Sequence, residues 1–469
     1  MQACRSRAGR TTANAPLRRP WDISLCPSRV AEAATAPLGH RRVLNIALPV
    51  VLSNATVPIL GAVDTGVVGH MGLAAPIGAV GIGAVILSAF YWVFGFLRMG
   101  TVGLTAQAEG VGDRAEVAAL LSRALMIGLG AGVVIIAAQA GLFWAAFRVS
   151  PASVEVETLA RQYMAVRVWS APAAIALYGI TGWLIAQERT RAVLVLQVWM
   201  NGLNIVLDLW FVIGLGWGVQ GVAFATFLAE WSGLALGLWF CRAVFATPAW
   251  RDRAQVFARA RWLRMMSVNG DILVRSLLLE AIFVSFMFMG AAKGDVTLAA
   301  NQVLMQFLMI TSYALDGFAF SAEALVGKAM GARQRLRLRR AAVLASGWGM
   351  GAAMLMASGF AVAGGTVIDA MTTAEAVRDA ARIYLPYLII LPPVACAAFM
   401  LDGIFVGATR SRDMRNMMAV SFVVYVVCAA VLYPTLGNHG LWLSMLISFV
   451  ARGLTLGARY PALERAAAV

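Results

Sequence analysis

Apolar residues fall in long blocks along nearly the whole chain, separated by short polar connections. A helix needs roughly 20 apolar residues to cross the hydrocarbon of a bilayer, and these blocks reach that length. The pattern predicts twelve membrane-spanning helices, at about 43–68, 76–100, 117–145, 162–186, 192–214, 218–243, 266–290, 296–322, 338–365, 380–406, 414–434 and 438–458. No connection is long enough to hold a soluble domain, so lipid surrounds most of the chain.

The two halves of the chain resemble each other. Four pairs of identical residues are each 221 positions apart: Tyr163 and Tyr384, Pro172 and Pro393, Gly182 and Gly403, and Arg191 and Arg412. This offset spans six helices, an even number, so both halves insert in the same orientation as parallel repeats. We therefore expect an all-α integral membrane protein, built as two parallel six-helix repeats around a central cleft, a design suited to alternating access.

The repeats divide the chain into expected segments. An arginine-rich, proline-containing stretch at 1–42 is predicted to be a disordered tail, with a transit peptide or an over-extended translation start as alternatives. An N-lobe (helices 1–6) is expected at 43–243, a cytoplasmic linker at 244–265, and a C-lobe (helices 7–12) at 266–460.

Composition agrees with a membrane protein, and charge gives its orientation. The chain is 61% hydrophobic and 13% charged, whereas soluble domains are about half apolar and about a quarter charged. Most of the 38 basic residues fall in the termini and in alternate short connections, which by the positive-inside rule places both termini in the cytoplasm. The same distribution, rather than a basic patch, argues against a nucleic-acid partner.

Carboxylates within the predicted spans are the main candidates for function, because each costs roughly 2.5–3.5 kcal/mol to insert. Asp64, Asp208 and Thr226 fall at one depth, in the outer half of the N-lobe, and Asn204 shares a helix face with Asp208. Together these oxygens suit a proton or a small hard cation. The alternative is a hydrogen-bonded polar plug that only fixes helix packing.

The remaining acids are ranked below this group. Glu280 in helix 7 is the comparable candidate in the C-lobe, and Glu230 either lines the cleft or is paired. Asp316 and Asp402 fall near the cytoplasmic ends of their helices, where a gate or packing role is expected. Arg275 is the only basic residue expected in the middle of a span.

Helix 1 contains two prolines, Pro49 and Pro58. A proline removes a main-chain hydrogen bond and kinks a helix. A bend at Pro49 that changes when the nearby carboxylate gains a proton would act as a gate, and a static kink is the alternative.

These residues together resemble the multidrug and toxic compound extrusion (MATE) family, most closely its DinF-like branch. The resemblance covers about residues 40–460. It rests on five segments: Ala47-Leu48-Pro49, Val63-Asp64-Thr65-Gly66-Val67-Val68-Gly69, Asn204-x-x-x-Asp208, Thr226, and Gly182 with Gln187-Glu188-Arg189-Thr190-Arg191.

The resemblance implies export of cationic, amphipathic compounds, driven by inward flow of protons or sodium ions. It implies a cation site at residues similar to Asp64, Asn204, Asp208 and Thr226, where sodium is the alternative to a proton, a bend at Pro49, and a recurrent helix-7 glutamate at Glu280. Helix 10 departs from the sodium-coupled branch, because Leu391-Pro392-Pro393-Val394-Ala395 stands where that branch has an aspartate. This departure favours protons.

The sequence thus predicts a secondary antiporter in the bacterial inner membrane, monomeric, without a cofactor, that exchanges small organic cations for protons or sodium. The first rival is a lipid-linked or polysaccharide flippase, whose cavity should present bases to an anionic pyrophosphate; Arg275 alone fits that poorly. The second is a membrane-embedded enzyme, but His40, His70 and His439 are far apart and form no catalytic cluster.

Overall fold

The computed structural model describes residues 38–69, 74–149 and 153–468; most of the predicted tail and the side chain of Asp64 lie outside the described part. The chain divides into two units, Met1–Gly39 and His40–Val469, and the helices below belong to the second.

The first half of this unit forms six spans, two of them in two pieces joined by a 3₁₀ turn. Its helices are α2 (His40–Gly69), α3 (Ala74–Trp92), α4 (Phe96–Val111), α5 (Arg114–Val149), α6 (Val154–Arg167), α7 (Ala171–Ala186), α8 (Thr190–Asp208) with the π-helix η3 (Leu209–Gly214), and α9 (Gly218–Phe240).

The second half forms six more spans, after the short connecting helices α10 (Arg242–Phe245) and α11 (Arg253–Val256). Its helices are α12 (Arg259–Ala291), α13 (Asp295–Gly331), α14 (Arg335–Met371), α15 (Glu375–Gly407), α16 (Ser411–Leu436) and α17 (Asn438–Ala466).

The twelve predicted helices are confirmed. Within the described residues, 11 helical stretches are long and apolar enough to cross a membrane, and α2, with 30 residues, is the twelfth. Several helices are longer than predicted: α12 begins at Arg259 rather than 266, and α13 continues to Gly331. Their ends carry polar residues, so the apolar pattern stops before the helix does.

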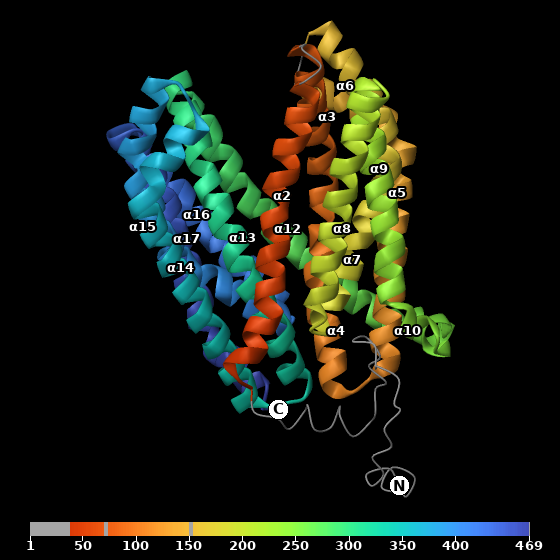
Figure 1. Ribbon diagram of the computed structural model, residues 1–469. Coiled ribbons are helices and arrows are strands. Elements are labelled where there is room, and N and C mark those ends of the chain that lie inside the picture. Colours follow the sequence, from red (N-terminus) through yellow and green to blue (C-terminus); the bar gives the residue numbers. More distant parts are fainter. Residues whose placement is uncertain (1–37, 70–73, 150–152, 469) are drawn as a thin grey trace, which may run out of the picture. The chain divides into compact units, whose positions relative to one another are not determined.

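We call the end of the bundle where α2 begins and α17 ends the tail end, and the opposite end the far end (Figure 1). The helix α2 packs along both α8 and α13, and so connects the two halves. The other main contacts between the halves join α4 to α13, α12 and α15.

The backbone repeats the sequence offset of 221 residues. Glu188, between α7 and α8, has φ 61°, and Thr409, between α15 and α16, has φ 50°. The same hydrogen bonds close both turns: Glu188 N–H donates to the carbonyl of Ile185 (2.8 Å), and Thr409 N–H to that of Val406 (2.9 Å). The internal repeat is therefore structural as well as sequential.

The two halves meet at the tail end through equivalent glycines. A Cβ atom at Gly110 of α4 would lie 2.2 Å from the carbonyl oxygen of Lys328, and one at Gly331 of α13 would lie 2.1 Å from that of Gln107. Gly110 and Gly331 are 221 positions apart, as are Gln107 and Lys328. The local two-fold axis of the repeat therefore passes between these helix ends, and only a residue without a side chain permits backbones this close.

We predict that Gly331→Ala pushes the halves apart at the tail end, because the new methyl group would overlap the backbone of α4. The expected cost is about 1–3 kcal/mol, seen as a lower thermal unfolding midpoint in detergent. Gly130→Ala is the matched control, since a Cβ there meets nothing within 4 Å. A native-like midpoint for Gly331→Ala would contradict the close contact.

Candidate cation site

Three of the predicted site residues lie together in the first half. The amide of Asn204 on α8 bridges the other two when it is oriented so that its oxygen and nitrogen both meet complementary partners. In that orientation its nitrogen donates to Asp208 Oδ2 (3.2 Å), and its oxygen accepts from the main-chain N–H of Thr226 on α9 (3.1 Å). The Thr226 hydroxyl donates to the carbonyl of Val222 (3.0 Å). Asp208 is 0% exposed and Asn204 1% exposed, so the carboxylate is held inside the helix bundle.

Backbone register places Asp64 at the level of this group, although its side chain is outside the described part. Two hydrogen bonds join α2 to α8: Thr190 Oγ1 to the carbonyl of Asn45 (3.2 Å), and Asn201 Nδ2 to Thr56 Oγ1 (2.7 Å). Each connects residues 145 positions apart, so the two helices run parallel with a constant offset. Residue 64 then lies opposite residue 209, the neighbour of Asp208.

Pro49 leaves a free carbonyl in α2, and α8 supplies its partner. Proline has no N–H, so the carbonyl of Asn45, four residues earlier, loses its helical hydrogen bond. Thr190, the first residue of α8, donates to that carbonyl. In the second half, Ser411 is the equivalent of Thr190, but α12 has no proline, and Ser411 instead donates to the side chain of Asp271 (2.8 Å).

A π-helix follows Asp208 directly. The segment η3 (Leu209–Gly214) continues α8 in this wider form, and such turns often occur at functional sites because they re-aim side chains. It is fixed by rings, with Phe211 stacked on Trp217 at 4.9 Å and on Trp210 at 5.3 Å. The equivalent stretch of the second half remains α-helical within α16, so this feature is specific to the half with the candidate site.

Glu280 is not part of this group. It lies on α12 in the second half, its side chain is exposed, and no hydrogen bond or ion pair of the described residues joins it to Asn204 or Asp208. Its assignment remains a prediction.

Glu230, which the sequence left open, is paired. Both of its carboxylate oxygens accept from the guanidinium of Arg167, at 2.8 and 2.9 Å. This two-pronged geometry fixes both side chains, so Glu230 serves the packing of α9 against α6.

The second half holds a buried cluster of charges. Arg275 of α12 and Arg452 of α17 both donate to Oδ2 of Asp402 on α15, the latter at 2.6 Å. All three are less than 10% exposed. Asp316 on α13 lies within electrostatic reach of both arginines and of Arg98. Asp402 therefore compensates buried positive charge, as its expected packing role requires.

The expectation that Arg275 is the only base in the middle of a span is wrong. Arg98, Arg167 and Arg452 also lie within membrane-length helices, and each is paired with an acid: Glu323, Glu230 and Asp402, respectively. The sequence could have identified these three arginines, because each lies inside a predicted span. Glu323, one position beyond the predicted end of helix 8, had no such signal.

The Arg98–Glu323 pair (3.0 Å) crosses between the halves, from α4 to α13, and the Arg98 guanidinium also lies 3.9 Å from the centre of the Phe320 ring.

The described residues contain no group of three or more His, Cys, Asp or Glu side chains placed to hold a metal ion.

We predict that Thr190→Val costs about 1–2 kcal/mol of unfolding free energy, because the carbonyl of Asn45 loses its partner. In a Pro49→Ala background the cost should largely disappear, since residue 49 regains an N–H for the same carbonyl. A double-mutant cycle measured by unfolding in detergent tests this. Strictly additive effects would show that the hydrogen bond from Thr190 does not compensate for the N–H that Pro49 lacks.

We predict that Asp402→Asn lowers stability by about 3–5 kcal/mol, because two buried guanidinium groups lose their shared counter-charge. Asp316→Asn should cost much less, since Asp316 accepts no hydrogen bond among the contacts described. Thermal unfolding midpoints and the yield of folded protein compare the two. Equal losses would mean that Asp316 shares the structural role.

Twelve membrane-length helices in two parallel repeats are an architecture typical of secondary transporters. The MatE family model matches the chain twice, at residues 49–210 and 272–432. The chain is 40% identical over 418 residues to DNA damage-inducible protein F of Escherichia coli, covering 88% of this chain and 90% of that one. It therefore belongs to the MATE family and, as that similarity indicates, to its DinF-like branch.

More distant relatives agree. The chain is 28% identical to a probable multidrug resistance protein NorM of Deinococcus radiodurans, over 90% of this chain and 94% of that one. A solved MATE structure in the bent conformation matches with a TM-score of 0.83 at 20% identity, over 92% of this chain and 97% of that one. The chain is a multi-pass inner-membrane transporter and not an enzyme.

Proposed function

We propose that this protein is a proton-coupled antiporter that exports cationic amphipathic compounds. One observation carries the proposal: the Asp208 carboxylate lies fully inside the bundle, fixed by Asn204 and level with residue 64. A carboxylate in such surroundings is costly and is a default functional candidate. The relatives named as multidrug resistance proteins support the substrate class.

The mechanism follows from the charge of this group. An ionised carboxylate attracts an organic cation. A proton that arrives from outside neutralises the carboxylate, and the organic cation is released. Only net charge gains from the membrane potential, about 2.3 kcal/mol for each charge that moves inward through 100 mV. An exchange of one proton for one monovalent cation moves no net charge, so the pH gradient drives it. The π-helix η3 adjoins Asp208, and Pro49 lies in the helix that carries Asp64. These two elements would therefore be the first to respond to the change of charge.

We place the tail end in the cytoplasm, because most basic residues of the connections fall there. Since the close contacts at Gly110 and Gly331 join the halves at this end, the conformation described is one that is closed toward the cytoplasm. Protons are favoured over sodium because Leu391-Pro392-Pro393-Val394-Ala395 of α15 supplies no carboxylate.

The flippase remains the second candidate, because Arg98 and Arg452 are further bases within the membrane-length helices. A structurally similar transporter from Pyrococcus furiosus (TM-score 0.79, 19% identity, over 90% of this chain and 96% of that one) is described as having a binding pocket of reverse polarity. In this chain, however, each of these arginines is paired with an acid, which leaves little charge for a pyrophosphate.

We predict that proteoliposomes containing the native protein export ethidium under an imposed pH gradient, independently of sodium. Asp208→Asn and Asp64→Asn should abolish the gradient-driven part of efflux, because the exchangeable charge is gone. Asp369→Asn is the matched control: this acid is 38% exposed, pairs with Arg382 at the far end, and should leave efflux unchanged.

Two outcomes would contradict this. If the folded native protein moves no organic cation under proton or sodium gradients, the export of cations is wrong, and lipid-linked substrates are tested next. If efflux survives both substitutions, the transporter stands but the site does not, and Glu280 becomes the first residue to change.

A further inference from the structure

The chain between the two halves is folded rather than extended. We call residues 241–259, from the end of α9 to the first residue of α12, the connecting segment. It contains α10, the 3₁₀ turn η4 (Pro248–Arg251) and α11. Joining two halves requires no such structure, so the connecting segment is a candidate for a further role.

Two residues of α5 hold the connecting segment against the first half. The hydroxyl of Ser122 donates to the carbonyl of Trp250 (2.9 Å). The guanidinium of Arg123, which is 0% exposed, donates to the carbonyls of Val256 (3.0 Å) and Gln255 (3.1 Å). The connecting segment therefore keeps a defined position beside α5.

The connecting segment lies to the side of the bundle. Figure 1 shows α10 projecting sideways beyond α5, in the half of the molecule nearer the tail end, and both η4 and α11 pack on α5. A part of the chain that extends sideways from a bundle of membrane spans has lipid, rather than other helices, next to it. Because the connecting segment joins the ends of two spans, that lipid is the headgroup layer.

Exposed arginines give the connecting segment its charge. It contains four of them against a single acid, Asp252, whose side chain accepts from the main-chain N–H groups at the start of α11. All four side chains are exposed, and none forms an ion pair with another described residue: Arg242, Arg251, Arg253 and Arg259. The surface of the segment is therefore strongly basic.

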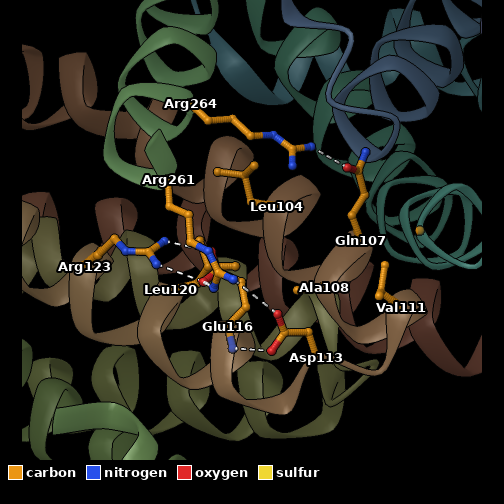
Figure 2. A pocket seen from close by; sticks show the side chains of 11 residues that line it. Leu104, Gln107, Ala108, Val111, Asp113, Glu116, Leu120, Arg123, Arg261 and Arg264 are labelled. Carbon is orange, nitrogen blue, oxygen red and sulfur yellow. Dashed lines mark hydrogen bonds and ion pairs between the residues drawn. The ribbon is translucent and has the colours of Figure 1, made fainter. Parts of the chain in front are cut away.

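The nearest acids of the first half belong to other pairs. Both carboxylate oxygens of Glu116 accept from Arg123, at 2.9 Å each. Arg261, in the first turn of α12, pairs with Glu116 and, at 3.6 Å, with Asp113 (Figure 2). These contacts use the acids at the edge of the connecting segment, so its own four arginines lack a counter-charge among the described residues.

Aromatic rings accompany these arginines. The guanidinium carbon of Arg242 lies 4.1 Å from the centre of the Trp239 ring, and that of Arg251 lies 4.7 Å from the centre of the Trp250 ring. Trp239 is 50% exposed and Phe257 is 56% exposed. Tryptophan is enriched where hydrocarbon meets headgroups, and arginine extends from there toward the polar side. The rings thus place the guanidinium groups at the depth of lipid phosphates.

We propose that the connecting segment is a binding surface for acidic phospholipids of the leaflet at the tail end. Its guanidinium groups donate to the headgroup phosphates, a contact for which their planar geometry is suited. Trp239 and Phe257 lie at the edge of the hydrocarbon. Clusters of arginine directly beside membrane spans attract acidic lipid in this way. The proposal rests on neither the transported substrate nor the coupling ion.

Hydrogen–deuterium exchange of the full chain in lipid nanodiscs tests the proposal. One set of nanodiscs contains phosphatidylcholine alone, and the other contains equal parts of phosphatidylcholine and phosphatidylglycerol. We expect the acidic lipid to slow exchange within residues 241–259 on the order of tenfold, because each arginine near an acidic surface adds to the attraction. Replacing Arg242, Arg251, Arg253 and Arg259 together by glutamine should remove this difference. Equal exchange of the native chain in both lipids would overturn the proposal.

A second variant loses the same amount of charge elsewhere at the tail end. It replaces four other exposed arginines by glutamine: Arg333, Arg339, Arg410 and Arg412. The slower exchange of residues 241–259 on acidic lipid should persist in this variant. If it disappears, the total charge of the tail end attracts the lipid, and the assignment to the connecting segment is wrong.

Inorganic phosphate distinguishes a lipid headgroup from a soluble anion. Added to the native chain in phosphatidylcholine nanodiscs, it should leave the exchange of residues 241–259 unchanged, because free phosphate has no acyl chains to hold it beside Trp239 and Phe257. Slowing as large as that on acidic lipid would make this a site for soluble anions and would contradict the proposal, whatever the protein transports.

Discussion

The absence of water from the hydrocarbon of the bilayer is the constraint on which the rest of this structure depends. Every buried polar group must find its partner within the protein. Helices satisfy most of the main-chain hydrogen bonds, and individual side chains pair with several of the remaining polar groups. Thr190 serves the carbonyl that Pro49 leaves free, Asn204 holds Asp208, and Asp402 compensates Arg275 and Arg452. The polar contacts of the interior therefore mark where the chain departs from a simple bundle.

Much of the fold was predictable from the sequence, because its signals are local or periodic. The apolar blocks gave the twelve helices, and pairs such as Gly182 and Gly403 gave the repeat. Asn204 and Asp208 were predictable as neighbours because they are four residues apart on one helix. The pairings Arg98–Glu323 and Arg452–Asp402 were not, since they join helices far apart in the sequence. The cation site remains a hypothesis, as no contact of the Asp64 side chain is described.

The two halves share a backbone but have diverged in chemistry. The first half groups the Asp208 carboxylate with the amide of Asn204 and the hydroxyl of Thr226, and a π-helix follows Asp208. The second half continues as a regular α-helix there and concentrates its buried charge in the cluster around Asp402. Duplication thus preserved the close backbone contacts that the junction needs, while the polar side chains were free to change.

The turn between α7 and α8 joins two features that seem unrelated. Within three residues, Glu188 contacts α13 across the junction and Thr190 contacts the proline-containing helix α2. Any displacement of this turn must act on both at once. A binding protein or small molecule that holds this turn in place would therefore restrain α2 and α13 together.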